Sequence, residues 1–337
     1  MEASDNITQG KTEKLSLTVR QIRFEANGIN SYELVHPEGL DLPSFSAGAH
    51  IDIHVNDRII RQYSLCNDPA DRKRYVIAVL RETAGRGGSE AVHDTVRVQD
   101  RVTVSHPRNN FQLVDAMKKA ILIAGGIGVT PLKSMAHDLE SRGIDYELHY
   151  CAKDSACVAF SEEFHTLAAK GRVKFHFDEG DPAKSLDIAK LLSEPLPGTH
   201  VYYCGPSGFM NACASATSDW AAGTVHSEHF KAPIASATAD ARAEQDAPGP
   251  SGGFSVRIAS TGQNFVVPAG QSLVEGLECV GIGLETSCLS GLCGTCKLEY
   301  LSGEVDHQDF ILGDDERERF LTACVSRGKA GTLVLNL

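Results

Sequence analysis

The chain has 337 residues, of which 42% are hydrophobic and 23% charged, a composition typical of a globular protein with two or three domains. Its net charge of -12 argues against binding to nucleic acid or to an anionic membrane, because phosphate binding relies on clustered Lys and Arg. No secretory leader pattern opens the chain, and no run reaches the roughly 18 apolar residues of a membrane span, so we expect a cytoplasmic protein.

The first part of the chain predicts an antiparallel β-barrel domain over residues 1–113. From Lys14 to Leu113, short apolar runs alternate with turn signals, which is typical of several strands in succession. These runs read LSLTVRQIRF, HIDIHV, IIRQYSL, RYVIAVL and RVTVSH.

Two segments of this barrel offer groups that suit a flavin phosphate and ring. The run RQYSL supplies a cation, an aromatic ring and a hydroxyl in Arg61, Tyr63 and Ser64, although alone it is an ordinary strand. The run GRGGS places Gly88 and Ser89 before a short helical segment, where Ser89 is a good N-cap and a phosphate would meet a helix N-terminus. A mobile glycine loop is an equally good interpretation of GRGGS alone.

Residues 114–231 predict an α/β domain with a parallel sheet, because strands alternate with helices. Strand AILIAG is followed by a helix from about Pro131 to Ser141, then by strand YELHYCA and helix SEEFHTLAAK. Two further strands, RVKFHF and HVYYCG, complete the pattern.

Two strand ends in this domain suit a nicotinamide cofactor. Strand AILIAG runs into the glycine-rich turn at Gly125 and Gly126, whose backbone N–H groups at a helix N-terminus could face a pyrophosphate. Strand HVYYCG ends at Cys204, Gly205 and Pro206, at the edge where open α/β sheets bind ligands. The turn is not G-x-G-x-x-G and is weak alone, and a lone Cys204 is as often inert packing.

Residues 232–253 predict a flexible linker, because Ala, Ser, Pro, Gly and Asp dominate them without apolar periodicity. The remaining residues, 254–337, predict an α+β domain. FSVRIAS and QNFVVP are typical of a hairpin, SLVEGLECVG of a helix and TLVLNL of a closing strand.

This last domain carries the strongest motif in the chain. Of ten cysteines, four form a C-x4-C-x2-C pattern with one distant partner, which is the spacing of plant-type 2Fe-2S ferredoxins. A zinc site is the alternative, but structural zinc sites usually pair two close cysteine knuckles, and the lone distant cysteine does not supply the second. We therefore expect the cluster ligands to be Cys288, Cys293, Cys296 and Cys324.

Taken in order, RQYSL, GRGGS, GGIGVTP, YCGPSGFM, VHSEHF and the four-cysteine pattern resemble the phthalate dioxygenase reductase family over essentially the whole chain. The resemblance implies an FMN-binding barrel, an NADH-binding domain of ferredoxin-reductase type and a C-terminal 2Fe-2S domain. It also implies service as the reductase component of Rieske-type oxygenases, with vanillate demethylase reductases as similar proteins.

The resemblance also implies site residues. FMN would be held by Arg61, Tyr63 and Ser64, its phosphate by Ser89 with flanking Gly88, and its ring would lie against Phe230. Gly126, Thr130, Cys204 and Pro206 would line the nicotinamide site.

Two cofactor choices follow, FMN against FAD and NADH against NADPH. FMN is favoured over FAD by the resemblance and by the lack of a separate adenosine-binding segment. NADH is favoured over NADPH because Asp154, after strand YELHYCA, could accept a ribose hydroxyl and repel a 2′-phosphate, although Lys153 would act in the opposite sense.

For a chain that holds both sites, we expect hydride transfer from the nicotinamide to the flavin and one-electron transfer from the flavin to the cluster. The electrons then pass from the cluster to a docked oxygenase. On this mechanism Cys204 touches the nicotinamide, and histidines such as His50, His106 and His137 need no catalytic role. Two alternatives stay open: a reductase for another acceptor, such as a non-Rieske hydroxylase or free ferredoxin, and a non-enzymatic ferredoxin-like carrier.

Overall fold

A computed structural model of the chain describes residues 14–56, 59–85, 87–231, 253–329 and 331–337. The predicted linker, residues 232–253, lies outside these ranges apart from Gly253. The chain divides into two compact units, residues 1–228 and 229–337, called here the first and the second unit. None of the helices in the described ranges combines the length and the apolar character that crossing a bilayer requires.

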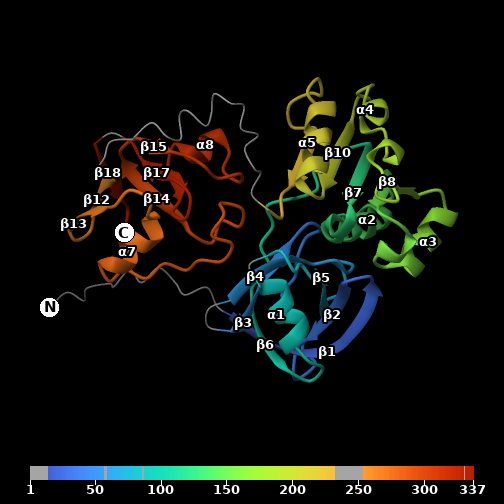
Figure 1. The fold of residues 1–337 in the computed structure, drawn as a ribbon, viewed down its shortest axis with the longest axis horizontal. Coiled ribbons are helices and arrows are strands. Elements are labelled where there is room, and N and C mark those ends of the chain that lie inside the picture. The colour runs from blue at the N-terminus through green and yellow to red at the C-terminus, as the bar shows by residue number, and fades with distance from the viewer. Residues whose placement is uncertain (1–13, 57–58, 86, 232–252, 330) are drawn as a thin grey trace. The chain divides into compact units, whose positions relative to one another are not determined.

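The first unit begins with the predicted antiparallel barrel, a six-stranded sheet in the order β4-β3-β6-β1-β2-β5 (Figure 1). Its core forms because apolar side chains alternate along the strands, as Leu17 and Val19 do on β1. Helix α1 (Gly88–Thr95) lies between β5 and β6 in the chain. The strands are β1 (Lys14–Ala26), β2 (Ile29–Val35), β3 (His50–Asn56), β4 (Ile59–Ser64), β5 (Arg74–Leu80) and β6 (Arg101–Ser105).

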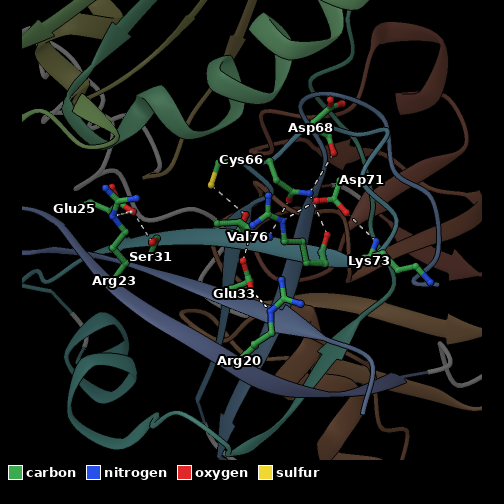
Figure 2. A network of polar contacts seen from close by, with 12 residues as sticks. Arg20, Arg23, Glu25, Ser31, Glu33, Cys66, Asp68, Asp71, Lys73 and Val76 are labelled. Atoms are coloured by element: carbon green, nitrogen blue, oxygen red, sulfur yellow. Dashed lines mark hydrogen bonds and ion pairs between the residues drawn. The ribbon is translucent and has the colours of Figure 1, made fainter. Parts of the chain in front are cut away.

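The barrel closes between the two outer strands of this order. Cys66, just after β4, donates its N–H to the carbonyl of Val76 on β5 at 2.8 Å, and its Sγ lies 3.2 Å from the same oxygen (Figure 2). Figure 2 also shows buried Glu33 on β2 bonded to Arg20 of β1, and Arg74 of β5 binds the same carboxylate at 2.6 Å. Burial raises the pKa of Glu33, and the two arginines outweigh that effect and lower it.

The second part of the first unit is a five-stranded parallel sheet in the order β11-β10-β7-β8-β9. After β7 the chain builds outward through β8 and β9, and then it returns to the other side of β7 for β10 and β11. The switch in direction falls between β7 and β10, where open α/β sheets bind ligands. The strands are β7 (Lys119–Gly125), β8 (Asp145–Ala152), β9 (Val173–Phe177), β10 (Thr199–Cys204) and β11 (Val225–Glu228).

The helices of this part lie where the sequence predicts them, with small differences. Helix α2 spans Val129–Arg142, two residues earlier than expected, because a 3-10 turn, η1 (Gly126–Gly128), leads straight into it. Strand β11 was not among the predicted strands. The other elements are η2 (Ser155–Cys157), α3 (Ser161–Ala169), η3 (Pro182–Lys184), α4 (Ile188–Leu191) and α5 (Ser207–Ala216).

Polar contacts join the barrel to the parallel sheet within the first unit. Lys133 of α2, only 6% exposed, donates from Nζ to the carbonyl of Cys66 at 3.1 Å and pairs with Glu163 of α3 at 2.9 Å. Arg23 of β1 pairs with Glu162 at 2.8 Å. A buried ammonium is stable only when it is bonded, so these contacts fix the barrel against α2 and α3.

The second unit contains a five-stranded sheet in the order β13-β12-β18-β14-β16. The predicted hairpin, helix and closing strand are confirmed as β12 with β13, α7 and β18. Helix α7 starts with a capping box between Ser272 and Glu275. The elements are β12 (Phe254–Ile258), β13 (Asn264–Val267), α7 (Leu273–Cys279), β14 (Lys297–Ser302), β15 (Val305–Asp306), α8 (Asp314–Arg317), β16 (Phe320–Thr322), β17 (Arg327–Gly328) and β18 (Thr332–Leu335).

Candidate redox site

The two predicted flavin-binding segments of the barrel meet in space. Arg61 lies on β4 and Gly88 begins α1, and a Cβ built on Gly88 would lie 1.9 Å from Arg61 Nε. Any side chain at position 88 would therefore displace this guanidinium. The Arg61 guanidinium thus lies against the N-terminus of the eight-residue helix α1. The cation and the helix N-terminus together suit an anionic group such as a phosphate.

The predicted N-cap role of Ser89 is wrong. Helix α1 begins two residues earlier than an N-cap at Ser89 implies, and its N-cap is Gly87, whose φ of 71° is open to glycine at little cost. Ser89 lies in the first turn instead, and its Oγ accepts the N–H of Glu82 at 3.0 Å. Gly87 has no side chain that could cap the first N–H groups of the helix. Ser89 thus holds the loop in shape, and its hydroxyl hydrogen stays available to an anion.

Tyr63 and Ser64 lie on the same strand as Arg61. The hydroxyl of Tyr63 is buried without a hydrogen-bond partner among the described residues, and burial raises its pKa. A buried hydroxyl without a partner is uncommon and points to a ligand that bonds it. Ser64, 4% exposed, donates from Oγ to Glu228 Oε2 at 3.4 Å.

Glu228 connects the barrel to the parallel sheet. It ends β11, opposite Cys204 in the parallel register, and its Oε1 lies 4.0 Å from Nδ1 of His50 on β3. Burial raises the pKa of Glu228 to about 8, and the bond from Ser64 lowers it only in part, so the carboxyl is mostly protonated at neutral pH. His50 is fully buried, and burial followed by the charge of Arg108 lowers its pKa to about 3.

The predicted nicotinamide segments also meet, at the switch point of the sheet. A Cβ on Gly128 would lie 2.2 Å from the carbonyl oxygen of Cys204, and one on Gly125 would lie 2.9 Å from Pro206 Cδ. A Cβ on Gly205 would lie 3.0 Å from the Cα of Gly125. The turn after β7 and the turn after β10 therefore pack backbone to backbone, which suits close approach of a dinucleotide.

The other predicted nicotinamide residues have contacts of their own. Gly126 adopts φ of 54° with open space where a side chain would be. Thr130 is buried and donates from Oγ1 to the carbonyl of Ile127 at 3.0 Å, so it shapes the turn. Asp154 follows β8, and one carboxylate oxygen accepts the N–H of Ala156 at 2.9 Å. Cys204 is fully buried, and burial raises the pKa of its thiol well above 9, so the thiol stays protonated.

The four cysteines of the second unit form two sulfur pairs. Cys296 Sγ donates to Cys324 Sγ at 3.2 Å, and Cys288 is hydrogen-bonded to Cys293. The bond from Cys288, together with Thr295 and backbone groups, outweighs burial and lowers the pKa of Cys293 to about 5. In the part of the chain that is described, no three His, Cys, Asp or Glu side chains surround a single ion position. Two pairs of thiols suit two irons, each taking two thiolates.

The loop around the cysteines supplies N–H donors to sulfur. The N–H groups of Ser290 and Leu292 both lie 3.4 Å from Cys288 Sγ. Gly291 has φ of 71°, and a Cβ there would lie 2.8 Å from Val325. The loop thus curls around one sulfur, as a site that carries negative charge requires.

Phe230, predicted to stack on the flavin ring, is 40% exposed and lies two residues after β11, in the second unit. Its stacking on the flavin ring stays a prediction.

The sequence interpretation did not assign His50, Gly128 or Glu228 to the site. Glu228 lies within VHSEHF, but the strand that it ends was not predicted, so its place at a sheet edge was not visible from the sequence. His50 had no signal either, because HIDIHV is typical of a plain strand.

Comparison with known families matches two parts of the chain. Residues 256–329 match the family of 2Fe-2S iron-sulfur cluster binding domains, a range that contains all four cysteines. Residues 122–215 match the family of oxidoreductase NAD-binding domains, a range that contains both turns of the switch point.

Comparison with whole proteins covers nearly the full chain. It is 53% identical to the tert-butanol monooxygenase / tert-amyl alcohol desaturase reductase subunit of Aquincola tertiaricarbonis, over 96% of each chain. The crystal structure of phthalate dioxygenase reductase, described as modular for electron transfer from pyridine nucleotides to [2Fe-2S], is 41% identical with a TM-score of 0.70 and covers 96% of this chain and 98% of that one. An intact type IV self-sufficient cytochrome P450 monooxygenase is 33% identical with a TM-score of 0.84, over 96% of this chain and 41% of that one.

Proposed function

The chain belongs to the phthalate dioxygenase reductase family, and we propose that it is the reductase component of a multicomponent oxygenase. It is an NADH-dependent oxidoreductase, and in the proposal its electrons pass through FMN and a 2Fe-2S cluster to a terminal oxygenase of the Rieske type. The observation that carries the proposal is the presence, in one chain, of a dinucleotide switch point and two cysteine pairs with ferredoxin spacing.

FMN is assigned to the barrel. Arg61 and the first turn of α1 suit its phosphate, and the buried hydroxyl of Tyr63 offers a hydrogen bond to a ligand. Ser64 and Glu228 extend the site toward β10 and β11. The fit rests on the unpartnered Tyr63 hydroxyl and on the space that Gly88 leaves for Arg61.

NADH is assigned to the switch point of the sheet. Gly126 is partly exposed with open space at its Cβ position, so a pyrophosphate can approach its backbone, while buried Gly125 and Gly128 pack this turn against Gly205 and Pro206. Buried, protonated Cys204 cannot act as a nucleophile, and its contact with the nicotinamide ring stays a prediction. The Asp154 carboxylate accepts bonds from Ala156 N–H and the Cys157 thiol, and its negative charge after β8 supports NADH over NADPH.

The cluster is assigned to the two sulfur pairs. Cys288 with Cys293 would hold one iron, and Cys296 with Cys324 the other. A bound flavin accepts two electrons together and gives them singly to such a cluster. The chain's own contribution is to bury three of the four cysteines and to direct the N–H groups of the loop at the partly buried fourth, Cys288.

A second acceptor class has support of its own. The same fold, with 33% identity, forms part of a self-sufficient cytochrome P450 monooxygenase, so a haem hydroxylase is the alternative partner. The match to the reductase subunit from Aquincola tertiaricarbonis covers 96% of each chain, which supports a separate oxygenase.

The ten free cysteines support a reducing compartment, and we keep the cytoplasm as the proposed location.

An anaerobic titration with NADH, followed by visible spectroscopy, tests this function. We expect flavin and cluster absorbance to bleach in sequence, and the released flavin to run as FMN on chromatography. A colourless protein that lacks iron and sulfide after reconstitution would overturn the proposal. Reconstitution with Rieske oxygenases and with haem hydroxylases, scored by NADH-coupled product formation, separates the two acceptor classes.

A further inference from the structure

The proposed reaction leaves a proton unaccounted for inside the first unit. A hydride carries two electrons and one proton, so NADH yields NAD+, two electrons and one proton when an iron-sulfur centre takes the electrons singly. Hydride delivery needs no acid or base of the protein, yet the proton has to leave a buried site. Buried groups that can pass a proton near the flavin position therefore matter.

Three side chains lie together at that position, each from a different strand. Ser64 and His50 face each other in the β3–β4 register, and both approach the carboxyl of Glu228 on β11. Ser64 Oγ is 3.4 Å from Oε2, and His50 Nδ1 is 4.0 Å from Oε1, so the two neighbours address different oxygens. A protonated carboxyl can accept a proton at one oxygen while it releases one from the other.

His50 is unusual among the buried polar side chains. It has no exposed surface, and neither of its ring nitrogens has a hydrogen-bond partner among the described residues. A buried imidazole without a bond is costly, so a partner is expected within reach. The last torsion of a Glu side chain is soft, so a rotation of the carboxyl can shorten the 4.0 Å between Oε1 and Nδ1.

The surroundings keep this pair free of net charge. The charged groups that act on His50 are Arg108 and Asp52, which pair with each other at 2.7 Å, and Arg108 disfavours an imidazolium. The groups that act on Glu228 are Ser64 and, through the neighbouring strand, the buried thiol of Cys204. Neither is a cation, so a carboxylate has no counter-charge.

We propose that His50 is a positioning residue for the flavin reaction: its Nδ1 accepts the proton on Oε1 of Glu228 and so leaves Oε2 as acceptor for Ser64. Each proton that arrives through Ser64 Oγ enters at Oε2, and one proton leaves from Oε1 to solvent, to which the Glu228 side chain as a whole exposes 11% of its surface. Charge and atoms balance, because the carboxyl holds one proton before and after. The inference rests on the proposed flavin site.

The test uses the holoprotein and the infrared C=O band of the Glu228 carboxylic acid, titrated from about pH 6 to about pH 10. The band is identified by its loss in Glu228→Gln. We expect it to persist at neutral pH and to vanish with a midpoint near 8. In His50→Phe, which removes the acceptor, the midpoint should fall by about one pH unit, since a bond to the neutral acid raises its pKa. His50→Asn, whose Oδ1 can replace Nδ1, should restore it.

The pH profile of flavin reduction by NADH is then measured for the parent, for each single variant and for the double variant of His50→Phe with Glu228→Gln. His50→Phe should shift the profile in the parent and have no further effect in Glu228→Gln. Three outcomes would overturn the inference. Glu228 could already be ionised near pH 6, or its midpoint could stay the same in His50→Phe. His50→Phe could also have an equal effect in the parent and in Glu228→Gln. The first result needs only Glu228→Gln, which identifies the band. Loss of FMN binding in the parent would instead overturn the proposed function.

Discussion

In the second unit, all four cluster ligands come from one segment, residues 288–324, and three of them share a single loop. In the first unit, the flavin and nicotinamide residues come from β3, β4, α1, β7, β10 and β11 and meet only because these elements pack together. A local site depends on few atoms, and a distributed site depends on many. Single substitutions should therefore abolish the first and weaken the second by degrees.

The largest effect is expected for Cys293→Ser. Serine cannot replace a thiolate in this pair, so the cluster absorbance should be lost entirely, and electron delivery to a protein acceptor with it. The flavin should still be reduced by NADH, because Arg61, Tyr63 and Ser64 lie in the first unit, away from the cysteines. Iron and sulfide analysis with stopped-flow spectroscopy measures both.

The matched control for this variant is Cys279→Ser, since Cys279 is exposed and lies outside the sulfur pairs. It should keep the cluster in full. If Cys293→Ser also loses flavin reduction, the two units are not independent, and the contrast between them fails.

The next effect is expected at the switch point of the sheet. In Gly128→Ala the new methyl group would lie 2.2 Å from the Cys204 carbonyl oxygen, which is backbone and cannot move cheaply. We expect the first unit to lose about 3 kcal/mol of its free energy of unfolding, with a KM for NADH raised about tenfold. Denaturant unfolding and steady-state kinetics measure the two quantities.

Gly126→Ala, in the same turn, is the comparison. No atom lies within 4 Å of its Cβ position, so only the positive φ is strained, at a cost of about 1 kcal/mol. Equal destabilisation by the two variants would mean that backbone packing between the two turns does not matter.

A smaller change is expected for Gly88→Ala in the barrel. The methyl group would push Arg61 from its place, and a long side chain can yield, so the fold should survive. FMN affinity should fall about tenfold, the value of one charge-assisted bond. Gly87→Ala, with φ of 71° but no atom nearby, should change stability and leave FMN affinity nearly unaltered. Fluorescence titration with FMN decides between them.

The same contrast explains what the sequence could predict. Cysteine spacing predicts the cluster site in full, because the ligands of a loop-borne site are close along the chain. The turn at Gly125 and the end of β10 at Pro206 were each predicted as weak signals. Their contact was not, since it depends on the order of β7 and β10 in the sheet.

Three particular failures have physical reasons. Ser89 was expected to cap α1, but Gly87 reverses the backbone two residues earlier and the helix starts there. Strand β11 reads VHSE, with no apolar pattern, and forms because the edge of β10 offers backbone bonds. His50 follows the alternation of an ordinary strand, and only the three-dimensional contact with Glu228 sets it apart.

A modest effect is expected from acid on the contact between α2 and α3. Burial raises the pKa of Glu163, but bonds from His137 and Lys133 outweigh it and lower the pKa to about 2. A lowered carboxyl pKa stabilises the fold above the unfolded value of about 4.5, and this contribution is lost as the pH falls toward 2. Because Glu163 is 39% exposed, we expect only about 1 kcal/mol. Glu163→Gln should flatten this part of the pH–stability curve of the first unit. An unchanged slope would show that the contact carries no such energy.

The smallest effect is expected for Asp154→Asn, which tests the cofactor preference. The amide oxygen of Asn can still accept the N–H of Ala156, so the turn after β8 should keep its shape while the negative charge is removed. Without that charge the 2′-phosphate of NADPH meets less repulsion, and Lys153 next to it favours the phosphate. The ratio of kcat/KM for NADPH over NADH should rise about fivefold, a change of about 1 kcal/mol. Asp154→Ala removes both the charge and the cap, so a larger drop with both cofactors separates turn shape from charge. If Asp154→Asn leaves the ratio unaltered, the preference is set elsewhere in the first unit, as a distributed site allows.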